Sequence, residues 1–300
     1  MKDEKIVVTY RGSYEDTEEN AVIHIEEGIV EIAERAFAGY THLKEVHFPK
    51  SLRKISASAF ADCPALCRVF MNSGLVEIGD EAFSGCTAIN GIVVPDTVSR
   101  IGEGAFEGCV GLSSIKLSES IYMIGAGAFA YCFNLTHITI PDSCVLVELS
   151  AFSSCFSLAS VKLSDNMTLL DDHIFDGCRS LSLVDLPLRL RKIGRGAFRG
   201  CTSLTSLILP IGVENIALDA FAGCTALSRI AIPKGVKDME GGEVFDTCDS
   251  LSEIAYGGSE DGWALLTGGK ALTVKKTDGS IRVPKITILD LDKIESEGSV

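Results

Sequence analysis

Residues 112–132 read LSSIKLSESIYMIGAGAFAYC, and most of the chain repeats this pattern at a fixed step. Its phenylalanine recurs every 23 residues, with one residue inserted before the last copy: Phe37, Phe60, Phe83, Phe106, Phe129, Phe152, Phe175, Phe198, Phe221 and Phe245. Three residues after each Phe except the first, where Tyr40 stands instead, comes a cysteine: Cys63, Cys86, Cys109, Cys132, Cys155, Cys178, Cys201, Cys224 and Cys248. A fixed step of this length is typical of a solenoid, in which copies of one structural unit stack side by side.

Apolar residues follow each Phe by six, nine and eleven positions, and this alternation is typical of a β-strand. A proline stands just beyond in most repeats, where its missing amide donor marks a strand end. Two more apolar positions, such as Ile121 and Ile124, precede the next Phe by eight and five residues. Because one such unit cannot close a core alone, we expect the copies to stack into a coil of parallel strands.

The repeated pattern L-x-x-I-x-L-P-x-x-V-x-x-I-G-x-x-A-F-x-G-C resembles the leucine-rich repeats of the BspA-like (bacterial surface antigen) class. The resemblance covers roughly residues 23–256, with Ser118 at the proline position in the stretch quoted above. It implies a leucine-rich-repeat solenoid of the α/β horseshoe class, strand-rich, with ten 23-residue repeats forming a parallel β-sheet coil. Members of this family look like surface adhesins or interaction modules, so the resemblance also implies binding rather than catalysis.

Both open ends of a solenoid expose apolar residues that need a cap. We expect residues 1–22 to form an N-terminal cap, residues 23–256 the repeats, and residues 257–300 a C-terminal cap. Residues 5–10 predict a short strand, which an acidic turn follows. The stretch GGSEDGWALL predicts a short helix whose Trp263 plugs the last turn, as in the terminal segment of the family. Residues 271–294 predict a small strand addition, with an edge that another chain can join.

The chain carries 41 acidic and 27 basic residues, a formal charge of −14, and 46% of its residues are hydrophobic. This composition predicts a folded protein, and its negative charge argues against a nucleic-acid partner. No apolar stretch is long enough to span a bilayer, so no membrane insertion is expected. The start MKDEKIVVTY lacks the apolar run of an export signal. We expect a cytoplasmic protein if Met1 is the true start, and a surface or secreted protein if an export signal was removed.

The cysteine column predicts one buried structural thiol per repeat, because zinc sites need close pairs such as C-x-x-C and none occurs. The five histidines are spread along the coil and no G-x-S-x-G motif is present, which argues against a nucleophilic enzyme. His24 and His47 share a repeat register and are expected to be neighbours, either as a weak metal pair or as solvated surface residues. Cys67 lies at an outward strand position. It is either a reactive thiol or a residue without a functional role. We therefore expect no cofactor, no metal and no catalytic residues.

Three exposed surfaces are candidate binding sites. The first is the outward strand face, seven, eight and ten residues after Phe, with the candidates Phe70, His137, Leu183 and Ile208. The second is an acidic rim thirteen residues after Phe, where closely spaced carboxylates call for a cation or a basic partner: Asp96, Glu119, Asp142 and Asp165. The third is a basic cluster within two adjacent repeats: Arg179, Arg189, Arg191, Lys192, Arg195 and Arg199.

These surfaces favour a non-enzymatic protein- or glycan-binding module that uses a rigid repeat surface in an adhesin-like or scaffold role. The alternative is a structural element that associates head-to-tail, in which the basic cluster of one copy meets the acidic rim of the next. An enzyme with a site at the C-terminal cap is the least favoured hypothesis. The sequence does not name the partner.

Overall fold

The computed structural model describes residues 9–10, 14–239 and 242–289. The chain divides into two compact units, Met1–Leu158 (the N-terminal unit) and Ala159–Val300 (the C-terminal unit). In both units, repeats contribute one longer and one shorter strand joined by turns, with little helix. The fold is therefore the leucine-rich-repeat solenoid that the sequence period predicts, a coil of parallel strands.

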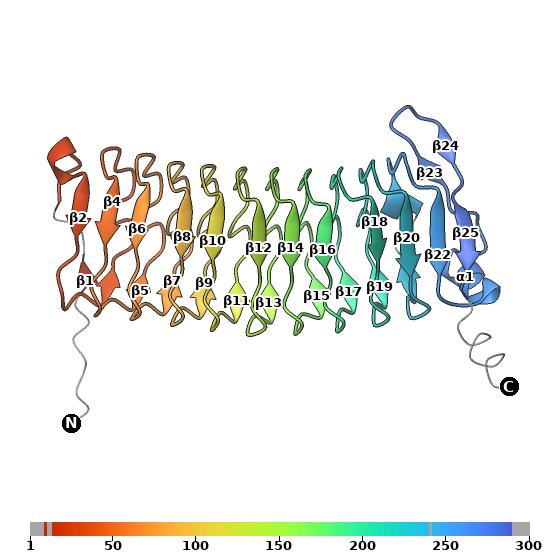
Figure 1. The fold of residues 1–300 in the computed structure, drawn as a ribbon, viewed down its shortest axis with the longest axis horizontal. Coiled ribbons are helices and arrows are strands. Elements are labelled where there is room, and N and C mark those ends of the chain that lie inside the picture. The colour runs from red at the N-terminus through yellow and green to blue at the C-terminus, as the bar shows by residue number, and fades with distance from the viewer. Residues whose placement is uncertain (1–8, 11–13, 240–241, 290–300) are drawn as a thin grey trace, which may run out of the picture. The chain divides into compact units, whose positions relative to one another are not determined.

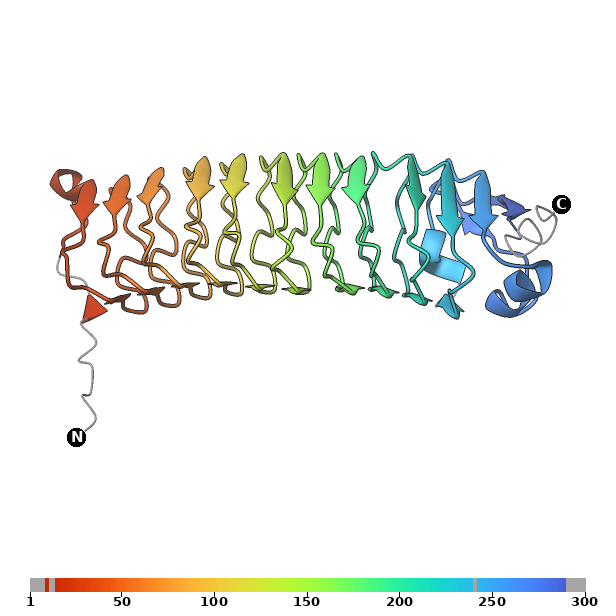
Figure 2. The ribbon, with the colours of Figure 1, turned by 60° about the horizontal axis from the view of Figure 1, so that its bottom comes forward.

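In the N-terminal unit the longer strands form one layer and the shorter strands a second, as Figure 1 and Figure 2 show. The longer strands are β2 (Val22–His24), β4 (Glu45–His47), β6 (Arg68–Phe70), β8 (Gly91–Val93), β10 (Ser114–Lys116) and β12 (His137–Thr139). The shorter strands are β1 (Thr9–Tyr10), β3 (Glu31–Ile32), β5 (Lys54–Ile55), β7 (Glu77–Ile78), β9 (Arg100–Ile101), β11 (Met123–Ile124) and β13 (Leu146–Val147). Paired strands are parallel and offset by one repeat, so that Ile55 lies opposite Ile78.

The C-terminal unit repeats this arrangement. Its longer strands are β14 (Ser160–Lys162), β16 (Leu183–Asp185), β18 (Ser206–Ile208), β20 (Arg229–Ile232) and β22 (Glu253–Tyr256). Its shorter strands are β15 (Leu169–Leu170), β17 (Lys192–Ile193), β19 (Asn215–Ile216) and β21 (Asp238–Met239). A 3₁₀ helix, η2 (Gly242–Phe245), carries the last phenylalanine of the period.

The alternation of the sequence explains which side chains point inward. In β8, β10 and β12 the middle residue is buried and the residues on both sides of it are exposed. The outward positions predicted from the sequence are therefore outward in the structure. Strands of two or three residues are enough to form a sheet here, because each strand pairs with the equivalent strand of the next repeat.

The repeated phenylalanines fill the interior, and their side chains are fully buried. In the N-terminal unit the rings of successive repeats, from Phe37 to Phe152, stack with centroids 4.8 to 5.4 Å apart. In the C-terminal unit the rings from Phe175 to Phe245 stack at 5.5 to 5.6 Å. These separations lie in the range of favourable aromatic pairs. Each ring thus occupies one layer of the core.

The cysteine column is structural, as the sequence predicts. All eleven cysteines are free thiols. The thiol of Cys109 donates a hydrogen bond to the main-chain carbonyl of Phe83 at 3.2 Å, and the thiol of Cys132 donates to that of Phe106 at 3.2 Å. The same contact recurs in other repeats, and the thiol is a second donor to a carbonyl that already accepts from a cysteine amide of its own repeat, as the Phe83 carbonyl does from the Cys86 amide. Burial raises the pKa of Cys109 to about 12.

In the repeats from Phe37 to Phe221, the turn around the phenylalanine reverses direction through two left-handed residues. They stand two positions before and two positions after the ring, as in Gly127 (φ 60°) and Tyr131 (φ 61°) around Phe129. Glycine occupies many of these positions because it adopts positive φ without strain. Side chains are nevertheless accepted at the first of them, as Glu81 (φ 54°) shows.

The N-terminal cap closes the first turn with aromatic and polar contacts. Strand β1 pairs in parallel with β3, which confirms the described end of the strand predicted over residues 5–10; residues 5–8 lie outside the described residues. The Tyr10 ring stacks on Phe37 with centroids 5.0 Å apart. The acidic turn contains a 3₁₀ helix, η1 (Glu18–Asn20), and the Asp16 carboxylate accepts hydrogen bonds from the amides of Thr41 and His42.

The C-terminal cap contains the predicted helix, α1 (Glu260–Leu266), which begins where the Ser259 hydroxyl accepts a hydrogen bond from the Gly262 amide. Trp263 is only half-buried, and its ring lies 5.3 Å from that of Tyr256. The tryptophan therefore packs against Tyr256, which fills the inward position of the last turn, and is not itself enclosed as a plug would be. No described helix is long and apolar enough to cross a membrane.

The predicted strand addition is also present. Strands β23 (Val274–Lys275) and β24 (Ile281–Arg282) form an antiparallel hairpin, and β25 (Lys285–Ile288) pairs in parallel with β22. Asp249 holds the hairpin to the last repeat by accepting hydrogen bonds from the hydroxyl and amide of Thr277, and these bonds lower the pKa of Asp249. The predicted stretch from residue 290 to 294 lies outside the described residues.

Candidate functional site

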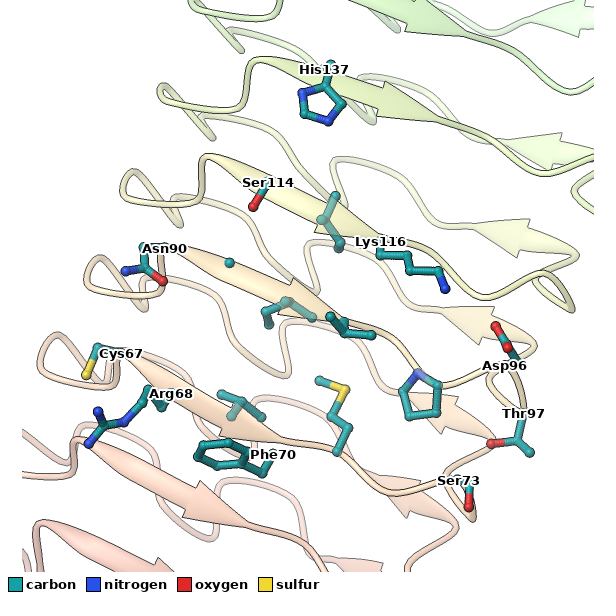
Figure 3. A pocket seen from close by; sticks show the side chains of 17 residues that line it. Cys67, Arg68, Phe70, Ser73, Asn90, Asp96, Thr97, Ser114, Lys116 and His137 are labelled. Atoms are coloured by element: carbon teal, nitrogen blue, oxygen red, sulfur yellow. The ribbon is translucent and has the colours of Figure 1, made fainter.

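An open groove lies on the outward strand face of the N-terminal unit, across β6, β8, β10 and β12 (Figure 3). Its volume is about 840 Å³, which is within the range typical of ligand sites. The groove joins two surfaces that the sequence predicts separately. Its lining includes Phe70 and His137 from the strand face and Asp96 from the acidic rim.

One wall of the groove is the end of a stack of aromatic rings. The rings of His24 and His47 stack with centroids 4.2 Å apart, and those of His47 and Phe70 at 4.4 Å. The next residue in this column is Val93, whose side chain is shorter, and Gly91 on the same strand has none. The side chains beyond the Phe70 ring therefore protrude less from the strand face, and the groove lies over these shorter side chains.

The charges along the groove are partly paired. The Glu45 carboxylate lies 2.5 Å from Nε2 of His47 and also accepts a hydrogen bond from Nε of Arg68. The bond with His47, with Arg68 as a further cause, lowers the pKa of Glu45. By contrast, among the described residues the ammonium of Lys116 has no hydrogen-bond or ion-pair partner. Lys116 lies opposite Val93 in the strand register, so its cation is beside the apolar part of the groove.

His24 and His47 are neighbours, as their shared register predicts, but they are stacked face to face rather than converging on one point. Within residues 9–10, 14–239 and 242–289, no group of three His, Cys, Asp or Glu side chains is arranged to hold a metal ion.

The other two predicted strand-face residues, Leu183 and Ile208, are exposed in the C-terminal unit and do not line this groove.

The acidic rim occupies the tips of the turns that connect longer to shorter strands, and Asp96, Glu119, Asp142 and Asp165 are all exposed. The Asp96 carboxylate has a structural contact, because the Glu119 amide donates a hydrogen bond to its Oδ1 at 3.4 Å. An acidic tip can therefore satisfy the amide of the next tip. A binding role for the rim stays a prediction.

The basic cluster is distributed over different segments of the repeat. Arg189 and Arg191 lie in the turn between β16 and β17, and Lys192 begins β17. Arg179 precedes β16, whereas Arg195 and Arg199 follow β17, and all six side chains are exposed. The structure thus keeps Arg189, Arg191 and Lys192 together and places the other three in other segments. Binding by this cluster also stays a prediction.

Comparison with known proteins identifies the class of this repeat. A family model described as the BspA type leucine rich repeat region, in six copies, matches residues 10–135 and 122–252. The chain belongs to the BspA-type leucine-rich repeat family. This confirms the resemblance drawn from the repeated pattern, and the BspA-type match covers most of the described chain.

Three solved structures that resemble this BspA-type chain come from bacteria. A leucine-rich repeat protein from Bacteroides ovatus is 23% identical, with 89% of this chain and 83% of that chain covered and a TM-score of 0.60. A leucine rich cell surface protein from Faecalibacterium prausnitzii is 24% identical, with 84% and 92% covered and a TM-score of 0.45. The pneumococcal vaccine antigen PcpA is 19% identical, with 92% and 86% covered and a TM-score of 0.45. No curated protein matches the sequence.

Sequence reasoning about this BspA-type chain missed several groove residues. Arg68, Gly91 and Lys116 line the groove, yet none stands out in the sequence as a motif. The available signal is the column of outward residues read across repeats: His24, His47, Phe70, Val93 and Lys116 stand 23 residues apart. Reading that column shows large rings giving way to a small apolar residue and then a cation.

Cys67 lines the groove and is only partly buried, whereas the other ten cysteines are buried. We expect one thiol of the native BspA-type protein to react rapidly with a maleimide, and all eleven to react after denaturation. The buried thiols are protected by lack of access and, where burial raises the pKa to about 12 as at Cys155, by scarcity of thiolate. Mass spectrometry of labelled peptides measures this. Rapid labelling of Cys109 in the folded protein would contradict the buried column.

Proposed function

We propose that this BspA-type chain is a non-enzymatic binding module, in an adhesin-like or scaffold role, whose groove on the N-terminal unit holds a protein or glycan partner. The observation that carries the proposal is the groove itself. It combines an exposed aromatic wall at Phe70, a small apolar residue at Val93 and the cation of Lys116, which has no partner within the described part of the chain. Binding sites typically combine apolar contact area with a few polar groups that fix orientation.

The rest of the chain supports binding rather than catalysis. The groove lies on a repeat scaffold whose outward side chains are held by parallel strands, so little order has to be gained when a partner binds. The one groove histidine, His137, has Nδ1 within 3.1 Å of the Thr136 hydroxyl, and the Cys67 thiol contacts the Lys44 carbonyl. The two groups belong to different repeats, with β8 and β10 between them (Figure 3), so they do not face each other as a nucleophile and a base would.

A pair of matched substitutions tests the groove. Val93 and Leu183 are both outward strand residues and both 66% exposed, but only Val93 lines the groove. We expect Phe70→Ser with Val93→Ser to weaken partner binding by about tenfold or more, since residues at the centre of an interface carry most of its energy. Leu183→Ser should leave binding unchanged. Arrays of defined glycans and purified proteins, followed by titration of each hit, measure the affinities.

The stability of the fold serves as the second control. All three side chains are exposed, so Leu183→Ser should unfold at the same denaturant concentration as the wild type, and the groove variant should lose only about 1 kcal/mol or less of stability. A hit that binds the groove variant and the wild type equally would remove the groove from consideration. A bulky maleimide on Cys67 should block the same hits, because this thiol lines the groove.

A second candidate function is assembly of several copies, and one observation favours it. Strand β25 ends the sheet β18-β20-β22-β25, and its outer edge is unpaired among the described residues. An open strand edge can join a strand of another chain. Light scattering over a range of protein concentrations tests this, and a monomer at every concentration and salt level would exclude it.

A further inference from the structure

The turn tips change in chemistry within the C-terminal unit, whose first tip, Asp165, is still acidic. Thirteen residues after Phe, the N-terminal unit has the acidic tips Asp96, Glu119 and Asp142. The same position in two successive repeats of the C-terminal unit holds Leu188 and Ile211, whose side chains are 79% and 82% exposed. Turns normally carry polar residues or glycine here. Two aliphatic tips in a row therefore need an explanation, because exposed side chains contribute nothing to the core.

Cations surround these two aliphatic tips. The Arg189 guanidinium follows Leu188 directly and donates a hydrogen bond to Oδ1 of Asn166. The Arg191 guanidinium reaches across to the next tip, where it donates to the Gly212 carbonyl at 3.3 Å and to the Glu214 carboxylate at 3.4 Å. The tips of adjacent repeats are thus in contact with the same arginine, so Leu188 and Ile211 belong to one continuous surface.

The charge of this surface is positive, in contrast to the molecule as a whole. Glu214 is shared between Arg191 and Lys237, whose ammonium lies 2.7 Å from the carboxylate. Arg189 and Lys192 add two further exposed cations beside the same turns. In a chain of formal charge −14, this edge is the part that an anionic surface attracts, while the acidic tips of the N-terminal unit are repelled.

We propose that this edge of the C-terminal unit docks onto an anionic lipid surface. Leu188 and Ile211 enter the apolar boundary of the bilayer, together with the exposed Ile208, which ends β18 three residues before Ile211. Arg189, Arg191 and Lys192 contact the lipid phosphates. A fluid surface suits these residues because separate protruding tips need no complementary pocket. Protein hot spots, by contrast, are rich in aromatic residues seated in pockets. Only side chains enter the lipid, so this contact differs from the membrane insertion that the sequence argues against.

Sedimentation with vesicles tests the proposal. The full chain is mixed with vesicles of phosphatidylcholine alone or with equal parts of phosphatidylglycerol, at low and high salt. We expect binding to the anionic vesicles, and weaker binding at high salt because the cations are screened. The variant with Leu188→Ser and Ile211→Ser should bind about tenfold less tightly or worse, since the apolar contact is lost. Val145→Ser, at an aliphatic residue of the N-terminal unit that is 57% exposed and lies outside the groove, is the matched control and should bind as the wild type does.

Several outcomes would overturn the proposal. They are equal binding to both kinds of vesicle, no binding to either, or anionic-vesicle binding that the double substitution leaves unchanged. If the wild type instead binds only a purified acidic protein, and the double variant loses that binding, the edge is a protein interface. The groove substitutions at Phe70 and Val93 act on a different unit, so their failure and the failure of lipid docking can be told apart.

Discussion

Replacing Phe106 with alanine is expected to remove about 3–5 kcal/mol from the free energy of unfolding. The Phe106 side chain is fully buried, and its ring stacks between those of Phe83 and Phe129 with both centroid separations at 5.4 Å. An alanine at this position leaves a cavity where the ring of one repeat has been removed from the stack. The neighbouring rings cannot close it, because each is held at the strand spacing by its own repeat.

Phe70→Ala provides the matched control, since Phe70 is also an aromatic residue of the N-terminal unit that stacks on one ring, but it is 46% exposed. Its loss should cost about 1 kcal/mol or less. Unfolding in guanidinium chloride, followed by circular dichroism, compares the two variants. A Phe106 variant as stable as the Phe70 variant would contradict the stacked interior. Because repeats can unfold separately, the transition should also be checked for more than one step.

The fold could be predicted from the sequence because every repeat carries the same information. An isolated run such as Ile121 to Ile124 says little, but ten copies of one apolar pattern leave a single consistent arrangement. The inward positions follow from that pattern, and the register follows from the fixed step, as the pairing of Ile55 with Ile78 shows. The caps were predicted less completely because they occur once: the role of Trp263 depends on Tyr256, which already fills the last turn.

The candidate site could be predicted only in part. Phe70 and His137 stand out because they interrupt a small polar face, yet the groove also requires that Gly91 has no side chain. A glycine in a strand is not a recognisable motif. Whether it opens a groove depends on the size of the side chains at the equivalent positions in the adjacent repeats. The extent of the basic cluster could not be predicted for a related reason: residues close in sequence, such as Arg179 and Arg189, are carried to different segments of a repeat that winds once around the core within 23 residues.

Replacing Gly125 with alanine is expected to destabilise the N-terminal unit by about 2–3 kcal/mol, through close packing of backbone on backbone. A Cβ atom at Gly125 would lie 2.6 Å from the Glu103 nitrogen and 2.6 Å from the Gly102 carbonyl carbon. These are backbone atoms of the preceding repeat, so no side chain can rotate away. The two repeats would have to move apart, and the stacking contacts on either side would weaken with them.

Gly127 offers a control two residues away, where the constraint is different. Its φ is 60°, but the nearest atom to a Cβ there is the Ala130 Cβ at 3.9 Å. The equivalent position in other repeats accepts Ser58 and Glu81 at positive φ, so Gly127→Ala should cost only about 1 kcal/mol. Chemical denaturation compares both variants with the wild type. If Gly125→Ala were no worse than Gly127→Ala, the spacing between these repeats would be set by the side chains of the core and could relax. If Gly125→Ala is the more destabilising variant, direct contact between the backbones of adjacent repeats sets their spacing. Repacking of side chains cannot then make room for the added methyl group.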